Sequence, residues 1–132
     1  MKRFGVVILA GLAAACTQNG VYREEVERDF LTLTTPNVVA EVIAENCTGI
    51  EPRLGAVMMG PSEVGVALRR KYTQADIDAT LDQRPLGELI GNSVDTYLAA
   101  RGVPLGDGRR LCDYGRSVLG GDDAVGALLL AG

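Results

Sequence analysis

Cys16, Cys47 and Cys112 are the side chains with the most definite chemistry in this sequence of 132 residues. In an oxidising compartment cysteines pair as disulfides, so an odd number leaves one thiol for another use. With Cys16 used elsewhere, Cys47 and Cys112 form an even pair, and we expect a disulfide between them. The alternative is two buried free thiols. A redox pair is disfavoured because the chain has no Cys-x-x-Cys motif.

Arg53 and Arg116 are the candidate binding residues, because each follows one of the paired cysteines. Arg53 lies six positions after Cys47, and Arg116 lies four positions after Cys112. A disulfide would bring the two segments together, where guanidinium groups can hold an anion by charge-assisted hydrogen bonds. The structural alternative is ion pairing with buried carboxylates. The sequence therefore offers Arg53 and Arg116 as anion-binding candidates.

The side chains that most catalysis needs are missing. The chain has no histidine, which excludes Ser–His and Cys–His nucleophile pairs and the commonest metal ligand. Two cysteines alone cannot complete a zinc site. Asp76 and Asp78 would point about 200° apart on a helix, and Asp122 and Asp123 sit where a helix start favours negative charge. We therefore expect no catalytic residues, no metal site, no cofactor and no enzyme activity.

The N-terminus has the order of parts found in a secretory signal. Met1-Lys2-Arg3 is a short positive segment, residues 4–12 are apolar, and Ala13-Ala14-Ala15 supplies small residues for cleavage. The uncharged run spans residues 4–15, whereas a helix that crosses a bilayer needs about 20 apolar residues. The sequence therefore predicts that residues 1–15 are a signal peptide and are removed.

The segment Leu12-Ala13-Ala14-Ala15-Cys16 resembles the lipobox of bacterial lipoproteins. In that class the peptidase cuts before the cysteine, whose sulfur carries a diacylglycerol. This segment departs from the pattern, since Leu12 lies four residues before the cysteine instead of three. The resemblance implies lipidation at Cys16 and a place on the periplasmic face of a membrane, with Thr17 favouring the outer membrane. The alternative is ordinary cleavage, a free thiol and a soluble periplasmic protein.

Charge limits the partners of the mature chain. Removal of residues 1–15 leaves 117 residues, enough for one domain with a core. It also removes two of the 13 basic residues and none of the 17 acidic ones, so the net charge becomes −6. This balance argues against nucleic acid and against peripheral binding to anionic lipid. The one basic run, Arg69-Arg70-Lys71, is either a phospholipid contact or a solvated helix C-terminus.

The elements that position these residues are predicted to be helices. Residues 16–36 are charged and poorly periodic, and we expect a tether there; residues 37–132 are expected to form the helical domain. Apolar spacing predicts helices over 37–47, over Ile50–Leu68 with an interruption at Gly60-Pro61, after the cap Thr73, from Pro85 to near Gly102, over Cys112–Leu119 and briefly after Asp122. The sequence thus predicts an all-α fold: a small bundle of five or six short helices, stapled by one disulfide.

Several segments together resemble a family of small exported bacterial two-cysteine helical proteins of unknown function. They are Asn46-Cys47 with Ile50 and Arg53, Thr73–Ile77, Tyr97–Val103, Leu111–Arg116 and Val125–Leu129. The resemblance covers residues 38–130 and departs from the family at Met59–Pro61, where relatives continue as helix. It implies an envelope location and a helical fold held by the two cysteines, and it implies no activity.

These features predict a non-enzymatic cell-envelope protein that acts through contacts with another envelope protein and reaches the membrane through its lipid anchor. The alternative is a periplasmic module that binds a small anion in a pocket between helices. A concave pocket with inward polar groups would favour the small ligand. An exposed apolar patch on a convex face would favour the protein partner.

Overall fold

The computed structural model describes residues 19–53 and 61–132 and shows a mostly helical chain. Within these two ranges, five α-helices, one 3-10 turn and two short strands follow one another in the order α1(Glu24–Asn46), β1(Ile50–Pro52), α2(Pro61–Arg69), α3(Gln74–Leu81), α4(Leu86–Ala99), α5(Gly108–Val118), η1(Gly126–Leu128) and β2(Leu129–Ala131). The all-α prediction with one disulfide is confirmed. The predicted signal peptide, residues 1–15, and Cys16 lie outside the described residues.

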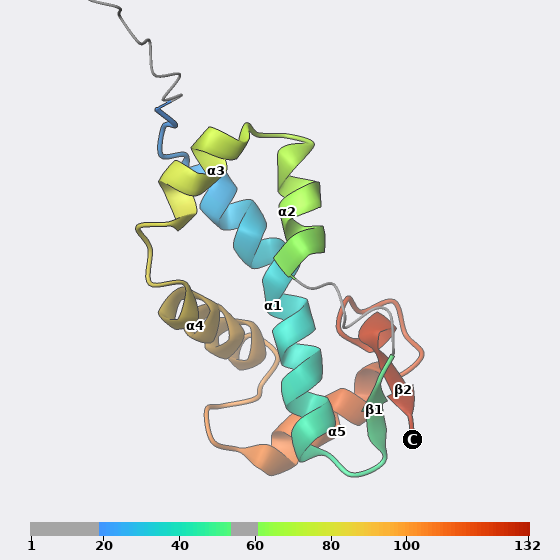
Figure 1. Cartoon of the computed structure of the whole chain (residues 1–132). Helices are drawn as coiled ribbons and strands as arrows, with labels where there is room; N and C mark the ends of the chain where they lie inside the picture. The colour runs from blue at the N-terminus through green and yellow to red at the C-terminus, as the bar shows by residue number, and fades with distance from the viewer. Residues whose placement is uncertain (1–18, 54–60) are drawn as a thin grey trace, which may run out of the picture.

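Helix α1 is the central element, and the other helices and strand β1 pack around it (Figure 1). The sequence predicts a tether over residues 16–36, and this prediction is wrong, because α1 begins at Glu24. Pro36 lies inside the helix, although an interior proline costs roughly 3 kcal/mol. Burial outweighs this cost: Val26 is fully buried and Thr35 is 4% exposed.

Two hydrophobic clusters lie along α1. The first, here the arm-end core, joins the N-terminal half of α1 to α2 and α3. It contains buried Val26, Val64, Leu68 and Ile77, with Phe30, Leu33, Tyr72 and Leu81 packed against it. The second, here the disulfide-end core, joins the C-terminal half of α1 to α4, α5 and the strands. Its buried members are Val39, Ala40, Ile43, Cys47, Ile50, Val94, Leu98, Val103, Leu111, Val125 and Leu129.

A disulfide between Cys47 and Cys112 joins the end of α1 to α5, as predicted, with 5.4 Å between the two Cα atoms. The two segments also approach closely at Gly115. A Cβ atom added there would lie 2.6 Å from Cγ2 of Ile43 and 3.0 Å from Cδ1 of Ile50. Glycine at this position therefore lets α5 lie directly against the buried side chains of α1 and β1.

Strands β1 and β2 form an antiparallel pair that the sequence patterns do not predict. Ile50 lies opposite Ala131 and Pro52 opposite Leu129. We expected Ile50 to begin a helix, and this prediction is wrong. Gly49 turns the chain with a φ of 82°, and Ile50 then becomes buried in the disulfide-end core. Residues 54–60 of this segment lie outside the described residues, and the helix expected after the interruption is present as α2.

Several predicted helix ends are confirmed. The Thr73 side chain accepts a hydrogen bond from the Asp76 amide at 3.2 Å, which caps α3. Gly102 follows α4 with a φ of 76°, and the Val103 amide donates to the Leu98 carbonyl at 2.9 Å. The expected last helix after Asp122 is only the 3-10 turn η1, because Leu129 continues into β2.

Replacing Gly115 with alanine is expected to lower the free energy of unfolding by about 1–2 kcal/mol, because the new methyl group overlaps the buried Ile43 side chain. Urea denaturation measures the change. Gly91→Ala is the matched control: it lies in α4, is exposed, and its Cβ would meet no described atom within 4 Å. That variant is expected to gain up to about 1 kcal/mol from helix propensity. Equal changes in the free energy of unfolding for Gly115→Ala and Gly91→Ala would contradict the close approach of α5 to α1.

Candidate functional site

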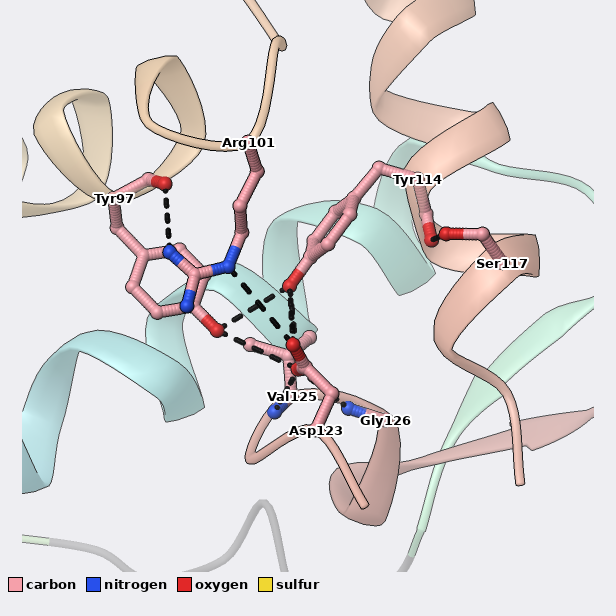
Figure 2. Close-up of polar contacts among 7 residues, drawn as sticks. All are labelled: Tyr97, Arg101, Tyr114, Ser117, Asp123, Val125 and Gly126. Carbon is pink, nitrogen blue, oxygen red and sulfur yellow. Dashed lines mark hydrogen bonds and ion pairs between the residues drawn. The ribbon is translucent and has the colours of Figure 1, made fainter. Parts of the chain in front are cut away.

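A polar network connects α4 and α5 to the segment before η1 (Figure 2). At its centre is the Asp123 carboxylate, whose side chain is 25% exposed. Oδ1 of Asp123 accepts hydrogen bonds from the amides of Val125 at 2.8 Å and Gly126 at 3.3 Å. Asp123 thus closes the turn that begins η1. We call Tyr97, Arg101, Tyr114 and Asp123 the Asp123 network.

Two tyrosines reach the same carboxylate from different helices. The hydroxyl of Tyr114 in α5 donates to Oδ1 of Asp123 at 3.2 Å, and that of Tyr97 in α4 lies 3.5 Å from the same oxygen. The two hydroxyls are 3.3 Å apart. Burial, and then the hydrogen bond with Tyr97, raise the pKa of Tyr114. Its phenol therefore stays protonated and serves as a hydrogen-bond donor.

Arg101 completes the network beside the Tyr97 ring. Its guanidinium carbon lies 3.4 Å from the ring centroid, Nη1 donates to the Tyr97 carbonyl at 3.0 Å, and Nε is 3.9 Å from Oδ2 of Asp123. Stacking and charge together hold the arginine in place. Hydrogen bonds and charge attraction connect the members of the network. We interpret the Asp123 network as the set of polar contacts that holds the C-terminal segment against α4 and α5.

A small cavity of about 310 Å³ lies next to this network, between the α4–α5 loop and α5. It is lined by Arg101, Gly102, Val103, Arg110, Asp113, Tyr114 and Ser117. Two guanidinium groups and two hydroxyls line it, with one carboxylate, Asp113. That carboxylate is itself within 3.5 Å of Nη1 of Arg116. The arrangement has the composition of a weak anion site.

The larger concave feature is an open groove of about 750 Å³ between α1 and α4. Its lining is mostly apolar, with short polar side chains along it: Arg28, Leu31, Thr32, Thr35, Pro36, Leu89, Asn92, Ser93, Thr96, Tyr97 and Ala124. The floor is tied together by a 2.7 Å hydrogen bond between the hydroxyls of Thr35 and Ser93. Sequence patterns miss the groove because half of it comes from the segment that we expected to be a tether.

A third cavity, of about 380 Å³, lies on the other side of α4, near the end of α1. Val42, Asn46, Val94, Leu98 and the α4–α5 loop line it. Leu105 in this loop is 86% exposed, the highest value among the large exposed hydrophobic residues. This end of the molecule therefore carries an apolar hollow beside an apolar projection.

The two predicted anion-binding arginines, Arg53 and Arg116, lie apart from the three cavities described above. Arg53 is exposed after β1, and its amide donates to the Leu128 carbonyl at 2.8 Å. Arg116 lies on α5 with its side chain 55% exposed, and its neighbour Asp113 is 66% exposed. Neither arginine lines the three cavities described above. The arginines that share a cavity are Arg101 and Arg110.

Asp76 has a structural role that the sequence does not reveal. Its Oδ1 accepts a hydrogen bond from the Val21 amide at 2.8 Å, and its Oδ2 lies 2.6 Å from Nε of Arg23. The Arg23 amide donates to the Thr80 hydroxyl at 2.9 Å. These bonds fasten residues 20–23, here called the arm, to α3.

Within the described ranges, no cluster of three potential metal ligands occurs, and no helix is long and apolar enough to span a membrane.

The contacts of the arm and the arm-end core are expected to lose stability in acid. The Val21 amide and then Arg23 lower the pKa of Asp76, and hydrogen bonds from Lys71 and then Tyr72 lower that of Asp29. A lowered carboxyl pKa stabilises the fold above the unfolded value of about 4, and this stabilisation is lost as pH falls through the folded pKa. Urea midpoints should therefore drop below about pH 4.

The matched control for this acid dependence is the double variant Asp29→Asn, Asp76→Asn. It should be less stable than the parent at pH 6 and should lose less stability between pH 6 and pH 3, since two of the titrating groups are gone. An unchanged pH dependence in the double variant would show that other carboxyls dominate acid unfolding.

The comparison with known families identifies the chain. The family of unknown function DUF5333 matches residues 22–130. The chain belongs to this family. The predicted resemblance to a family of unknown function is confirmed, but the DUF5333 match begins at residue 22 and not at 38. It thus includes the first half of α1, in agreement with the burial of Val26. No curated protein and no solved structure matches the chain.

Proposed function

We propose that the protein is a non-enzymatic lipoprotein of the cell envelope, anchored through Cys16, that binds a partner protein in the groove between α1 and α4. The export pattern of residues 1–15 and the lipobox-like segment support the location. The Cys47–Cys112 disulfide is consistent with it, because disulfides persist in oxidising compartments. The groove is the observation that carries the binding function.

The shape and lining of the groove fit a protein segment better than an enclosed small ligand. It is open along its length, and it lies between two helices, as do the grooves that accept an amphipathic helix. Leu31, Pro36 and Leu89 offer apolar contact, while Asn92 and Thr96 offer hydrogen bonds at the edge. We therefore propose an amphipathic helix of another envelope protein as the ligand.

A photocrosslinking amino acid placed at Asn92 in intact cells tests this function. Asn92 is exposed and lines the groove, and a reproducible adduct with one envelope protein is expected. Gly91 is the matched control, since it is exposed on the opposite face of the same helix, outside the groove. Ala124→Trp, which fills the groove, should abolish the Asn92 adduct. No reproducible adduct, or equal adducts from both positions, would contradict the proposal.

The cavity beside Arg101 and Arg110 supports a second candidate function, binding of a small anion. Here the guanidinium groups come from the α4–α5 loop region, and Arg53 and Arg116 are not involved. Titration with inorganic phosphate, followed by amide chemical shifts, tests this site. Shifts centred on the cavity that disappear in Arg110→Gln and persist in the control Arg116→Gln are expected. Identical titrations of the two variants would contradict an anion site in this cavity.

A further inference from the structure

We propose that the end of the molecule formed by the arm, α3 and the α2–α3 turn lies against a phospholipid bilayer. The inference rests on the proposed lipid anchor at Cys16, and it adds the orientation of the domain and the surface that meets the lipid. The groove and the α4–α5 loop would then point along or away from the membrane, where a partner can reach them.

The arm is bonded to the domain and is not a free linker. A Cβ atom at Gly20 would lie 1.8 Å from the Ala75 carbonyl oxygen, so the backbone of the arm lies directly on α3. The Val21 amide and the Arg23 side chain are then held by Asp76, at 2.8 Å and 2.6 Å. Residues Gly20 to Arg23 therefore move with the domain.

The chain between the anchor and this bonded arm is short. Cys16 and Gly20 are four residues apart, and an extended chain covers at most about 3.6 Å per residue, or roughly 14 Å here. A lipid on Cys16 consequently holds Gly20 and the adjoining part of α3 within about that distance of the bilayer surface. A domain attached so closely cannot turn its opposite end to the membrane while the arm faces away from it.

The side chains at this end suit a lipid surface. Val21 and Tyr22 are 60% and 50% exposed, and they stand beside the attachment point. Tyrosine favours the membrane–water interface, where its apolar ring and its polar hydroxyl are both accommodated. An exposed valine beside it can bury its methyl groups in the same layer. Two of the five large exposed hydrophobic residues of the described chain thus lie in the arm.

The basic run lies at the same end. The turn between α2 and α3 lies at the same end of α1 as the arm (Figure 1). Arg69, Arg70 and Lys71 are exposed there, and Nζ of Lys71 lies 2.5 Å from Oδ2 of Asp29 in α1. Glu24 and Glu25, exposed at the start of α1, carry the opposite charge. Charge therefore does not supply affinity for the membrane. The acyl chains supply affinity, and the short arm supplies orientation.

Leu105 marks the opposite end. It lines a cavity together with Asn46, the last residue of α1, while the arm precedes the first. The 23 residues of α1 span roughly 34 Å at 1.5 Å per residue. An exposed hydrophobic residue thus lies at each end of the same helix, which gives a matched pair of probe positions.

Tryptophan fluorescence can distinguish the two ends, because the chain contains no tryptophan. The lipidated full-length protein would be prepared as Tyr22→Trp and, separately, as Leu105→Trp, and incorporated into phosphatidylglycerol–phosphatidylethanolamine vesicles containing lipids brominated near the headgroup. Both positions are exposed, so both variants should keep the fold, which circular dichroism checks. Emission from residue 22 is expected to be largely quenched, and emission from residue 105 to be retained.

A longer arm provides the control. Insertion of about a dozen glycine and serine residues after Thr17 should keep the protein on the vesicles and relieve the quenching at residue 22, since flexible linkers of this length extend well beyond the native arm. Equal quenching at residues 22 and 105, or none at residue 22 in vesicle-bound protein, would overturn the orientation alone. Failure of the protein to bind vesicles would overturn the lipid anchor and, with it, the orientation.

Discussion

Replacing Cys47 and Cys112 together with alanine is expected to lower the free energy of unfolding by about 4 kcal/mol, the loop-entropy value for a bridge between residues 65 apart. The loss is large because domains of this size are typically stable by only about 5–15 kcal/mol. Cys47 is also 3% exposed in the disulfide-end core, so its truncation removes packing as well. Most of the remaining stability should come from the hydrophobic clusters around α1.

Urea denaturation of the parent protein, with and without a reductant, separates the bridge from the packing. Reduction breaks the bridge and leaves both sulfur atoms in place, so it should account for most of the loss seen in the double alanine variant. An unfolding midpoint that does not respond to reduction would mean that the cross-link adds no net stability. The loss of stability in the double alanine variant would then come from the packing of Cys47.

Asp123→Ala is expected to lower the free energy of unfolding by about 2–3 kcal/mol, since hydrogen bonds to a charged group contribute about 1.5–3 kcal/mol and several donors lose their acceptor together. The amides of Val125 and Gly126 and the hydroxyl of Tyr114 all donate to this carboxylate. The C-terminal segment that carries Leu129 into the core should loosen first.

Asp122→Ala is the control for this prediction, because Asp122 is the exposed neighbour and has the same charge. It should change the stability by less than about 0.5 kcal/mol, as surface substitutions usually do. Tyr114→Phe removes a single donor to Asp123 and should fall between the two. Similar losses for Asp122→Ala and Asp123→Ala would mean that charge at this position matters and the network does not.

Local rules predict the helical class, the bridge and several helix ends correctly. The start of α3 at Thr73 and the end of α4 at Gly102 are predicted correctly, because a capping hydroxyl and a left-handed glycine act within a few residues of chain. The disulfide follows from counting cysteines once Cys16 is set aside. These features depend on neighbouring residues or on composition, and a single sequence contains that information.

The remaining features depend on contacts between distant segments. Nothing near Pro36 indicates that α1 continues through it, because the compensation comes from the burial of Val26 and Thr35 against other elements. Strand β1 exists because β2, nearly 80 residues away, supplies its partner. The Asp123 network likewise joins residues from α4, α5 and the segment before η1. The sequence indicates that Asp123 precedes a helical turn, but it gives no sign of the two tyrosine partners, which come from α4 and α5.

The two hydrophobic clusters along α1 imply that the molecule opens unevenly. Amides of α1 near Ile43 lie beside the cross-link, so their hydrogen exchange should require global unfolding, whereas the turns around Phe30 depend on the smaller cluster with α2 and α3. Local unfolding of that end would release the arm from Asp76 while the Cys47–Cys112 end stays folded. In the orientation proposed above, the part of the domain that opens most readily is the part nearest the membrane. A brief opening there would lengthen the tether by at most the 19 residues from Gly20 to Val38, which precede buried Val39, and would let the rest of the protein reach partners farther away.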